Sequence, residues 1–393
     1  MTEEISADEL KEMIDRDQSF YLVDNRDEDV FSQWHIKNAI NYPFSNDDKL
    51  RKEDIEELKS KFGVQEEDKV VAVCAKGVSS FNFAEELERF GYERTFVLDG
   101  GMNEWSRVYD VVPIITKSSD ITILQIQRRA KGCLGYIVGS RRSGEAVIVD
   151  PSQHIDKYVE TARENGFKIV HVFDTHIHAD HISGGSKLAD RLNVPYSLGS
   201  KASNRSVNFS YKSAKHNQVF RYGGIRMKAI HTPGHTSEMT SYLINEEGVI
   251  TGDMLFVESI GRTELEFEAD LAKEGAGMQY DSIVNKIMTL PDSFKILPSH
   301  FSLTEEGEAI DVNPGMPMFT TIGYLREKNE ALRMDRGEFI EYMFENIPSK
   351  PPNYDRIIEI NLGKGESPDE KEKIKLELGP NRCATSQESM VKK

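Results

Sequence analysis

Short apolar runs and helical patterns alternate along the first part of the chain. "FYLVD" (20–24) and "DKVVAVCA" (68–75) are typical of parallel strands that are covered on both faces. A helical pattern follows in "SSFNFAEELERFGY" (79–92), with serine at its expected start and Gly91 at its expected end. "RTFVLDGG" (94–101) indicates one more strand and a turn. This order predicts a small α/β domain with a parallel sheet.

A second α/β pattern begins after a proline-containing, polar junction at residues 111–119. We expect strands at 121–127, 134–140, 145–151 and 167–175, with a helix over 154–165. Later strands are expected near 225–230, 241–245, 248–252 and 294–300, with a helix near 280–289. The expected domains span residues 1–112 and 120–362, and the polar, charge-dense tail 363–393 is expected to be loose.

Composition narrows the class of protein. A chain of 393 residues is long enough for two or three domains of roughly 100–200 residues each. Its formal net charge of −17 argues against nucleic acid as a main partner, because phosphate binding needs concentrated Lys and Arg. No apolar run approaches the roughly 20 residues of a membrane span, and the acidic start "MTEEISADELKEMIDRDQ" lacks the basic region of a secretory signal. We therefore expect a cytoplasmic protein with no membrane partner.

The three cysteines are far apart, which does not predict a disulfide framework. Cys74 ends a buried strand and precedes a helix, so backbone N–H groups and a helix N-terminus can surround its sulfur. A thiolate in such surroundings has a depressed pKa and is a nucleophile, although a cysteine at a strand end is also consistent with simple packing. Cys133 lies inside a strand pattern and is expected in the core, and Cys383 lies in the polar tail.

Three segments of the first domain follow one another in a familiar order and spacing: "LVDNRDEDVFSQWHIKNAINYPF" (22–44), "CAKGVSS" (74–80) and "VLDGGMNEWSR" (97–107). Together they resemble the rhodanese-like sulfurtransferase domains. The resemblance implies that Cys74 carries a sulfane sulfur as a persulfide, surrounded by the loop amides of residues 75–80. The related phosphatases of this fold need an Arg in the loop to bind phosphate, and this loop contains none.

A second cluster of chemical groups follows the buried strand at 167–175. "THIHADH" (175–181) supplies His176, His178, Asp180 and His181, and imidazole with carboxylate is a donor set that suits zinc and iron. Three later strand ends add polar residues, and α/β folds place chemistry at such ends; these residues are His235 in "HTPGHT", Asp253 in "VITGD" and His300 in "ILPSH". The sequence therefore predicts a metal site. We assign His231 a supporting or structural role, and His154, His171 and His216 to packing.

This set of motifs resembles the metallo-β-lactamase superfamily across about residues 120–345. The resemblance implies an αββα sandwich with the metal at one edge, between two sheets. The chain as a whole is thus expected to be α/β, with a rhodanese-like parallel-sheet domain first and this sandwich second.

Two chemistries within the superfamily are compatible with the residues present. Dizinc thioester hydrolases similar to hydroxyacylglutathione hydrolase imply one zinc at His176, His178, His235 and Asp253, and another at Asp180, His181, Asp253 and His300. Persulfide dioxygenases imply a single Fe(II) per chain at His176, His235 and Asp253, which leaves positions open for a sulfur and for O₂. In that case His178, Asp180, His181 and His300 orient the ligands.

Further segments favour the dioxygenase resemblance. "GRTE" (261–264) is similar to a dioxygenase segment that reads GRTD or GRPD, which makes Arg262 a candidate for binding an anionic thiol substrate. A structural ion pair explains this Arg equally well, and Glu264 departs from the family's Asp. "TTIGYLREKNEAL" (320–332) and "PSKPPNYDRIIEIN" (348–361) resemble the tails of dioxygenases that are fused to rhodanese domains. The sequence "FSL" after His300 departs from the Asp and Tyr of human-type relatives.

The fusion also has a chemical reason, because sulfite and a persulfide together give thiosulfate, which is a rhodanese reaction. We expect oxidation of glutathione persulfide, or a similar low-molecular-weight persulfide, by O₂ to sulfite and thiol, with sulfane-sulfur transfer by Cys74. The alternatives are a dizinc thioester hydrolase and a non-enzymatic sulfur carrier or sensor with a structural metal. Cys383 is similar to a C-terminal cysteine of some dioxygenases, and a homo-oligomer is compatible with the sequence.

Overall fold

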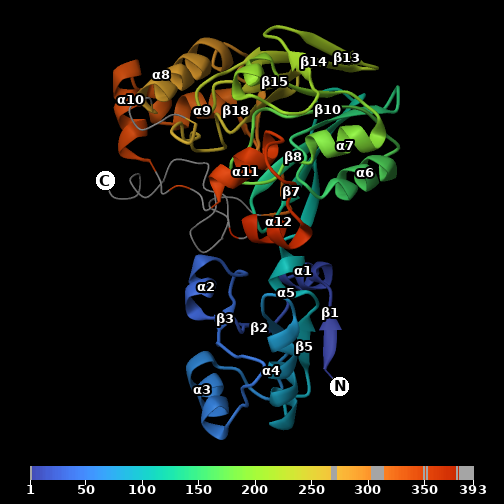
Figure 1. Ribbon diagram of the computed structural model, residues 1–393, viewed down its shortest axis with the longest axis vertical. Helices are drawn as coiled ribbons and strands as arrows, with labels where there is room; N and C mark the ends of the chain where they lie inside the picture. Colours follow the sequence, from blue (N-terminus) through green and yellow to red (C-terminus); the bar gives the residue numbers. More distant parts are fainter. Residues whose placement is uncertain are drawn as a thin grey trace.

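The computed structural model describes residues 2–266, 272–301, 314–347, 350, 353–377 and 379. Cys383 and the end of the predicted tail lie outside the described residues. Within the described residues the strands form three sheets, and Figure 1 shows them in two lobes. The first lobe, drawn in blue, contains β1–β5 and α1–α5, and the second lobe contains the other two sheets.

The first sheet is parallel, with the strand order β1-β5-β4-β2-β3. Its strands are β1 (Glu3–Ile5), β2 (Tyr21–Asp24), β3 (Ile40–Asn41), β4 (Val70–Val73) and β5 (Thr95–Leu98). Its helices are α1 (Ala7–Asp15), α2 (Glu28–Gln33), α3 (Lys52–Phe62), α4 (Val78–Arg89) and α5 (Gly101–Trp105). One face packs on α1 and α5 and the other on α3 and α4. The predicted small α/β domain with a parallel sheet is confirmed.

The second lobe is built on two mixed sheets. The strands of the second sheet are β6 (Tyr109–Ile114), β7 (Ile121–Arg128), β8 (Cys133–Ser140), β9 (Glu145–Val149), β10 (Lys168–Phe173), β11 (Tyr196–Gly199) and β12 (Lys212–Ala214). Those of the third are β13 (Val219–Tyr222), β14 (Ile225–His231), β15 (Thr240–Ile244), β16 (Gly248–Gly252), β17 (Lys295–Pro298) and β18 (Thr320–Thr321). Each sheet follows this sequence order across its width, so neighbours in sequence are neighbours in space.

Helices cover the outer face of both sheets, and apolar side chains fill the layer between them. The second sheet carries α6 (Ile155–Glu164), α7 (Gly185–Leu192) and the 3₁₀ segment η1 (Ser200–Arg205). The third carries α8 (Ala272–Ser282), the π-helical η3 (Ile283–Ile287), α9 (Ile322–Lys328), η4 (Ala331–Arg333) and α10 (Arg336–Glu345). Of the side chains between the sheets, Tyr136, Val147 and Tyr242 are completely buried. The predicted αββα sandwich is confirmed, and Figure 1 shows α6 and α7 opposite α8 and α10.

The expected junction at 111–119 is shorter than its composition suggests. Strand β6 runs to Ile114 and pairs with β7 along its whole length. Its side chains from Val111 onward are alternately exposed and buried, as is typical of a strand with one face toward solvent. Pro113 is compatible with this strand since β6 lies at the edge of its sheet.

The segment after residue 362 differs from the expected loose tail. Helix α11 (Tyr354–Asn361) is followed by α12 (Glu370–Leu376), which begins at an Asp369 cap. Leu376 and Glu377 are buried, and Figure 1 shows α12 on the side of the second lobe that faces the first. The sequence does not predict this burial, because α12 is mostly charged and contributes only one buried side chain, Leu376.

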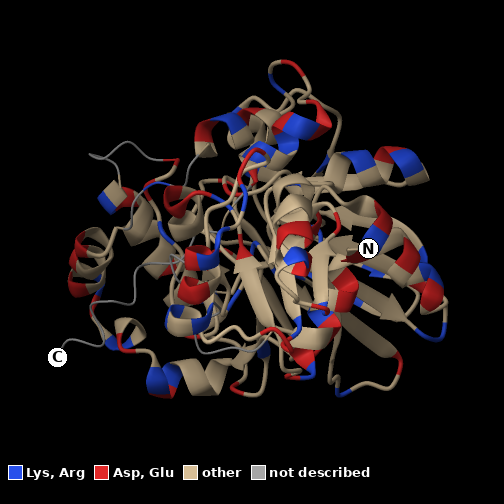
Figure 2. Ribbon diagram, turned by 90° about the horizontal axis from the view of Figure 1, so that it is seen from below, with Lys and Arg blue, Asp and Glu red and all other residues tan. Residues whose placement is uncertain are grey.

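Charged side chains of both signs are distributed over the helices. Figure 2 shows Lys and Arg interleaved with Asp and Glu along the helices. None of the helices in the described part of the chain has both the length and the apolar character that a membrane crossing requires.

Candidate catalytic centres

The first centre is the loop around Cys74, directly after β4 and before α4. The Ser80 hydroxyl donates to Cys74 Sγ over 3.4 Å, and the thiol is only 5% exposed. Burial raises the pKa of this thiol, but hydrogen bonds from Ser79, Ser80 and the Lys76 backbone outweigh it, so the pKa lies below its ordinary value. Cys74 therefore directly follows a buried strand, in surroundings that favour its thiolate form.

The third segment of the first lobe, "VLDGGMNEWSR" (97–107), packs against this loop through its backbone. The backbone N–H of Met102 donates to the carbonyl of Cys74 over 2.8 Å, and that of Asn103 donates to Ala75 over 3.2 Å. A Cβ atom on Gly101 would lie 2.1 Å from the Cys74 carbonyl oxygen, and its φ is +58°. Glycine at this position therefore lets two backbone segments approach each other closely.

The second centre gathers the polar strand ends of the second lobe. The segment 175–183, which we call the metal loop, follows β10, and His235, Asp253 and His300 follow β14, β16 and β17. All seven predicted residues are at most 1% exposed, and the structure brings them together: His176, His178, Asp180, His181, His235, Asp253 and His300.

The possible metal donors fall into three separate groups within the described residues. In each group, one ligand atom per residue lies within 4.8 Å of all the others. The first group is His176, His235 and Asp253; the second is Cys133, Asp180, His181 and His300; the third is Asp150, Asp174 and His178. His178 shares its group with two carboxylates, although its ring centroid lies only 4.2 Å from that of His176.

The two oxygens of Asp253 face different partners. Oδ1 is 2.6 Å from His300 Nδ1, and the other nitrogen of His300 lies 2.8 Å from Asp180 Oδ2. Oδ2 faces His176 Nε2 at 3.6 Å and His235 Nε2 at 3.7 Å. Burial raises the pKa of Asp253, but the charge and hydrogen bond of His300 outweigh it and keep the pKa below its usual range. This carboxylate is therefore ionised, with one oxygen directed at the two imidazoles.

The rings of His176 and His235 are oriented by their other nitrogens. His235 Nδ1 donates to the Arg262 carbonyl over 2.6 Å, and His176 Nδ1 is 2.9 Å from the Thr175 hydroxyl. Burial and the neighbouring His178 keep the pKa of His176 well below its usual value, so this ring is neutral. Both rings thus turn Nε2 toward Asp253, which is the arrangement of metal-binding histidines.

A fit to a metal ion can be tested on these atoms. In the part of the chain that the structure describes, His176 Nε2 and Asp253 Oδ2 are buried without a hydrogen-bond partner. Buried polar atoms normally have partners, so an unpaired nitrogen facing an unpaired carboxylate oxygen indicates a ligand between them. Two imidazoles and a carboxylate are donors that suit iron or zinc. The first group therefore fits a divalent transition metal.

Several side chains that the sequence does not single out fix the metal loop. Asp150 accepts from the Thr175 backbone N–H over 2.7 Å, and Glu238 accepts from that of Ile177 over 2.9 Å. Asn361 and Glu377 contact the far end of the loop. The sequence shows that these residues are acids or amides, but it does not show that they contact the metal loop, because their partners lie up to 195 positions away in the chain.

Other candidates are also placed by the structure. Cys133 is buried, as expected, but lies 3.7 Å from Asp180 Oδ2 rather than among apolar side chains alone. Arg262 is 1% exposed and forms an ion pair with Glu264, the structural alternative left open by the sequence; its role in substrate binding stays a prediction. His154 and His171 have hydroxyl partners, namely Tyr109 for His154 and Ser197 and Tyr222 for His171.

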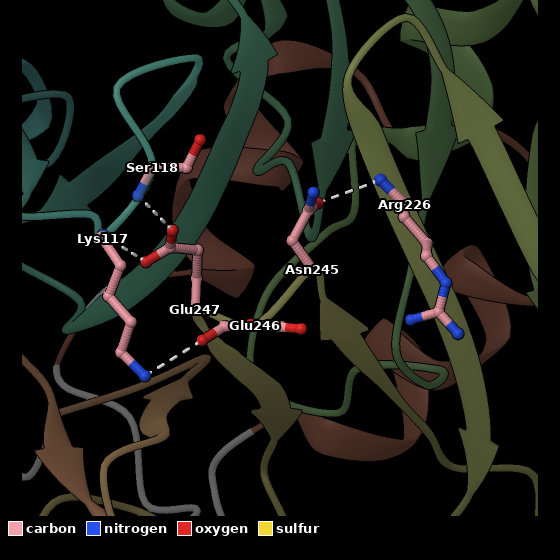
Figure 3. Close-up of a pocket in the computed structure, with 6 residues that line it drawn as sticks. All are labelled: Lys117, Ser118, Arg226, Asn245, Glu246 and Glu247. Carbon is pink, nitrogen blue, oxygen red and sulfur yellow. Dashed lines mark hydrogen bonds between the residues drawn. The ribbon is translucent and has the colours of Figure 1, made fainter.

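A cavity of about 680 Å³ lies elsewhere in the second lobe, between the β6–β7 connection and the β14–β16 strands. Figure 3 shows that Glu247 accepts from the backbone of Lys117 and Ser118 there, while the Lys117 ammonium reaches the carbonyl of Glu246. The residues that line this cavity include none of the predicted site residues.

Two family models match the chain. The "Rhodanese-like domain" model matches residues 6–108, and the "Metallo-beta-lactamase superfamily" model matches residues 129–300. Both expected resemblances are thereby confirmed.

The curated relatives and solved structures described next each cover about three fifths of the chain. The mitochondrial persulfide dioxygenase ETHE1 of Mus musculus is 30% identical over 235 residues, covering 58% of this chain and 83% of the relative. The Homo sapiens protein of the same name is 28% identical over 233 residues, with the same coverages. The crystal structure of ETHE1 from Myxococcus xanthus matches with a TM-score of 0.52 and 27% identity, covering 61% of this chain and 97% of that one. A metallo-beta-lactamase from Staphylococcus aureus subsp. aureus COL matches with a TM-score of 0.56 and 28% identity, covering 62% and 73%.

Proposed function

The chain belongs to the ETHE1 family of persulfide dioxygenases, and on that premise we propose that its second lobe oxidises a low-molecular-weight persulfide with O₂ at a single Fe(II). The proposed ligands are His176, His235 and Asp253. Glutathione persulfide is the proposed substrate type. Both atoms of O₂ go to the terminal sulfur, and water then releases sulfite and the free thiol.

The similarity to persulfide dioxygenases, together with the donor group of His176, His235 and Asp253, carries this proposal. The first group contains a carboxylate with one free oxygen and two imidazoles turned toward it. A dizinc hydrolase uses these residues together with His178, whose ring centroid lies 4.2 Å from that of His176, and with the second donor group, which includes Asp180, His181 and His300. The donor positions suit either metal content, and the similarity to persulfide dioxygenases favours a single metal.

The chain's own residues set the charge and the geometry of the centre. With two imidazoles and one carboxylate as ligands, a divalent ion would keep a net positive charge, which would favour an anionic persulfide sulfur over a neutral thiol. The Arg262 carbonyl and the Thr175 hydroxyl fix the two rings, and His300 fixes the carboxylate. When bound, Fe(II) supplies the open coordination positions and the redox chemistry that oxygenation of a sulfur atom needs. His178, Asp180 and His181 are proposed to maintain the loop rather than to bind the metal.

The first lobe is proposed to transfer sulfane sulfur through Cys74. In the direction that forms thiosulfate, the Cys74 persulfide gives its outer sulfur to sulfite, and the cysteine leaves as a thiolate. Sulfite is the proposed product of the second lobe, so the two reactions share an intermediate. The lowered pKa of Cys74 supports this role because a good leaving thiolate has a low pKa.

Variants of two histidines in one loop test the metal assignment. The full chain, purified from iron-replete cells, is compared with His176→Ala and His178→Ala for metal content, O₂ uptake on glutathione persulfide and thioester hydrolysis. We expect His176→Ala to lose iron and O₂ uptake, and His178→Ala to retain a single iron and measurable uptake. A pair of zinc ions, loss of metal from both variants, and hydrolysis without O₂ uptake would support the thioester hydrolase instead.

A further inference from the structure

The end of the metal loop is attached to the last residue of α11 through one side chain. Asn361 Nδ2 donates to the carbonyls of His178 and His181, each over 2.8 Å, and its Oδ1 accepts from the Ser183 N–H over 2.9 Å. Asn361 is 8% exposed. A single amide thus makes three hydrogen bonds to a stretch of backbone that has no helix or strand of its own.

The residue that follows α12 completes this attachment. Glu377 Oε1 accepts from the Ile182 N–H over 2.6 Å, and Oε2 accepts from Arg128 over 2.7 Å and from Gln153. Glu377 is 3% exposed and Arg128 is 2% exposed, so the pair is buried. Arg128 Nε also donates to the Ser106 carbonyl in the first lobe over 2.8 Å. The same carboxylate therefore contacts the metal loop and the arginine that touches the first lobe.

The attached backbone carries Asp180, and Asp180 leads to the proposed metal ligands. Asp180 Oδ2 lies 2.8 Å from His300, and His300 lies 2.6 Å from Asp253 Oδ1. Displacement of residues 178–183 moves Asp180, releases His300 and frees Asp253 to turn. The oxygen of Asp253 that faces His176 and His235 is thus oriented through a continuous set of contacts that begins at the C-terminal helices.

We propose that Asn361 and Glu377 are positioning residues that preorganise the metal centre from the C-terminal helices. This inference rests on the proposed use of His176, His235 and Asp253 as ligands. Loss of contacts that orient metal ligands typically lowers metal affinity about 10–100-fold. We expect an effect of that size from either residue, although both lie outside the groups of possible metal donors.

Cobalt(II) binding to the metal-free full chain tests the proposal without any turnover. Asn361→Ala and Glu377→Gln are titrated anaerobically with Co(II), and the dissociation constant and the visible spectrum of the bound ion are recorded. Asn208→Ala is the control for the first, since Asn208 is exposed and its side-chain amide donates to the Gly363 carbonyl over 3.2 Å. Glu370→Gln is the control for the second, because Glu370 pairs with Lys373 on the surface of α12.

We expect both test variants to bind Co(II) about 10–100-fold more weakly than the unmodified chain, with an altered spectrum, and both controls to be unchanged. A folded Asn361→Ala variant with unchanged affinity and spectrum would overturn the proposal. The Co(II) result does not depend on the reaction catalysed, so failure here is distinguishable from failure of the proposed dioxygenase activity.

Hydrogen exchange on the unmodified chain gives a second test that no folding defect can obscure. Because linkage is reciprocal, a metal that is stabilised by the C-terminal helices must in turn stabilise them. We expect peptides spanning residues 354–377 to exchange more slowly once Co(II) is bound. Protection of the metal loop with no change over 354–377 would contradict the proposal.

Discussion

Replacement of Gly101 by alanine is expected to disable the Cys74 loop without disturbing the second lobe. The new Cβ would lie 2.1 Å from the Cys74 carbonyl oxygen and 2.9 Å from the backbone nitrogens of Lys76 and Gly77. Real Cβ atoms essentially never approach closer than 3.0 Å, so the Cys74 carbonyl and residue 101 must move apart by at least 3.0 − 2.1 = 0.9 Å. The hydrogen bond from the Met102 N–H to the same carbonyl holds the two segments together, so they cannot move apart without weakening it.

Two effects of different size follow from this geometry. The positive φ of +58° costs an alanine about 1–3 kcal/mol of stability, wherever in the structure such a residue lies. The displacement also misplaces the amides that stabilise the Cys74 thiolate, and a shift of about 1 Å in a catalytic group can cost roughly 10²-fold in rate. We therefore expect sulfur transfer through Cys74 to fall about 10²-fold.

Gly91→Ala is the matched control for this experiment. Gly91 has a φ of +94° in the same lobe, but its Cβ would meet only the Glu66 side chain, at 3.8 Å or more. Both variants should lose stability, and only Gly101→Ala should lose reactivity. The assay is the rate of Cys74 alkylation by iodoacetamide, followed by mass spectrometry, alongside persulfide formation on Cys74. Equal alkylation rates in the two variants would refute the reasoning.

Two further predictions concern single hydrogen bonds and ion pairs. Ser80→Ala removes a hydrogen bond that favours the Cys74 thiolate, so the pKa of Cys74 should rise. Its alkylation should then slow at neutral pH, with a rate–pH midpoint at higher pH; an unchanged midpoint would count against the proposed contact. Glu377→Ala leaves the buried Arg128 without its carboxylate partner, so the free energy of unfolding should fall by about 3–5 kcal/mol in denaturant titrations. Glu370→Ala, which breaks an exposed pair, should change it by less than about 1 kcal/mol; equal effects would show that burial of the pair is unimportant.

The features that could be predicted from the sequence are those that depend on residues close together in the chain. The runs that become β4 and β9 are almost entirely apolar, so their burial within a sheet follows from composition alone. The Cys74 loop and the histidine-rich metal loop are each contained in fewer than ten consecutive residues, and the structure places both directly after buried strands.

The features that could not be predicted depend on partners that are far away in the chain. Glu377 is one of many acidic residues in a polar segment, and its burial follows only from Arg128, which lies 249 positions earlier. The sequence predicts Cys133 to be a core residue, because its neighbours in the chain give no indication that its thiol contacts Asp180. The contact of His178 Nε2 with Asp150 Oδ1, over 3.5 Å, depends on a residue that follows another strand. In each case a side chain's chemistry is visible in the sequence but its environment is not.

O₂ uptake by the purified, metal-quantified chain on glutathione persulfide tests the central claim most directly. The account predicts a single iron per chain, uptake that scales with iron content, and one sulfite or thiosulfate formed for each O₂ consumed. A chain that contains zinc, consumes no O₂ and hydrolyses a glutathione thioester would contradict it.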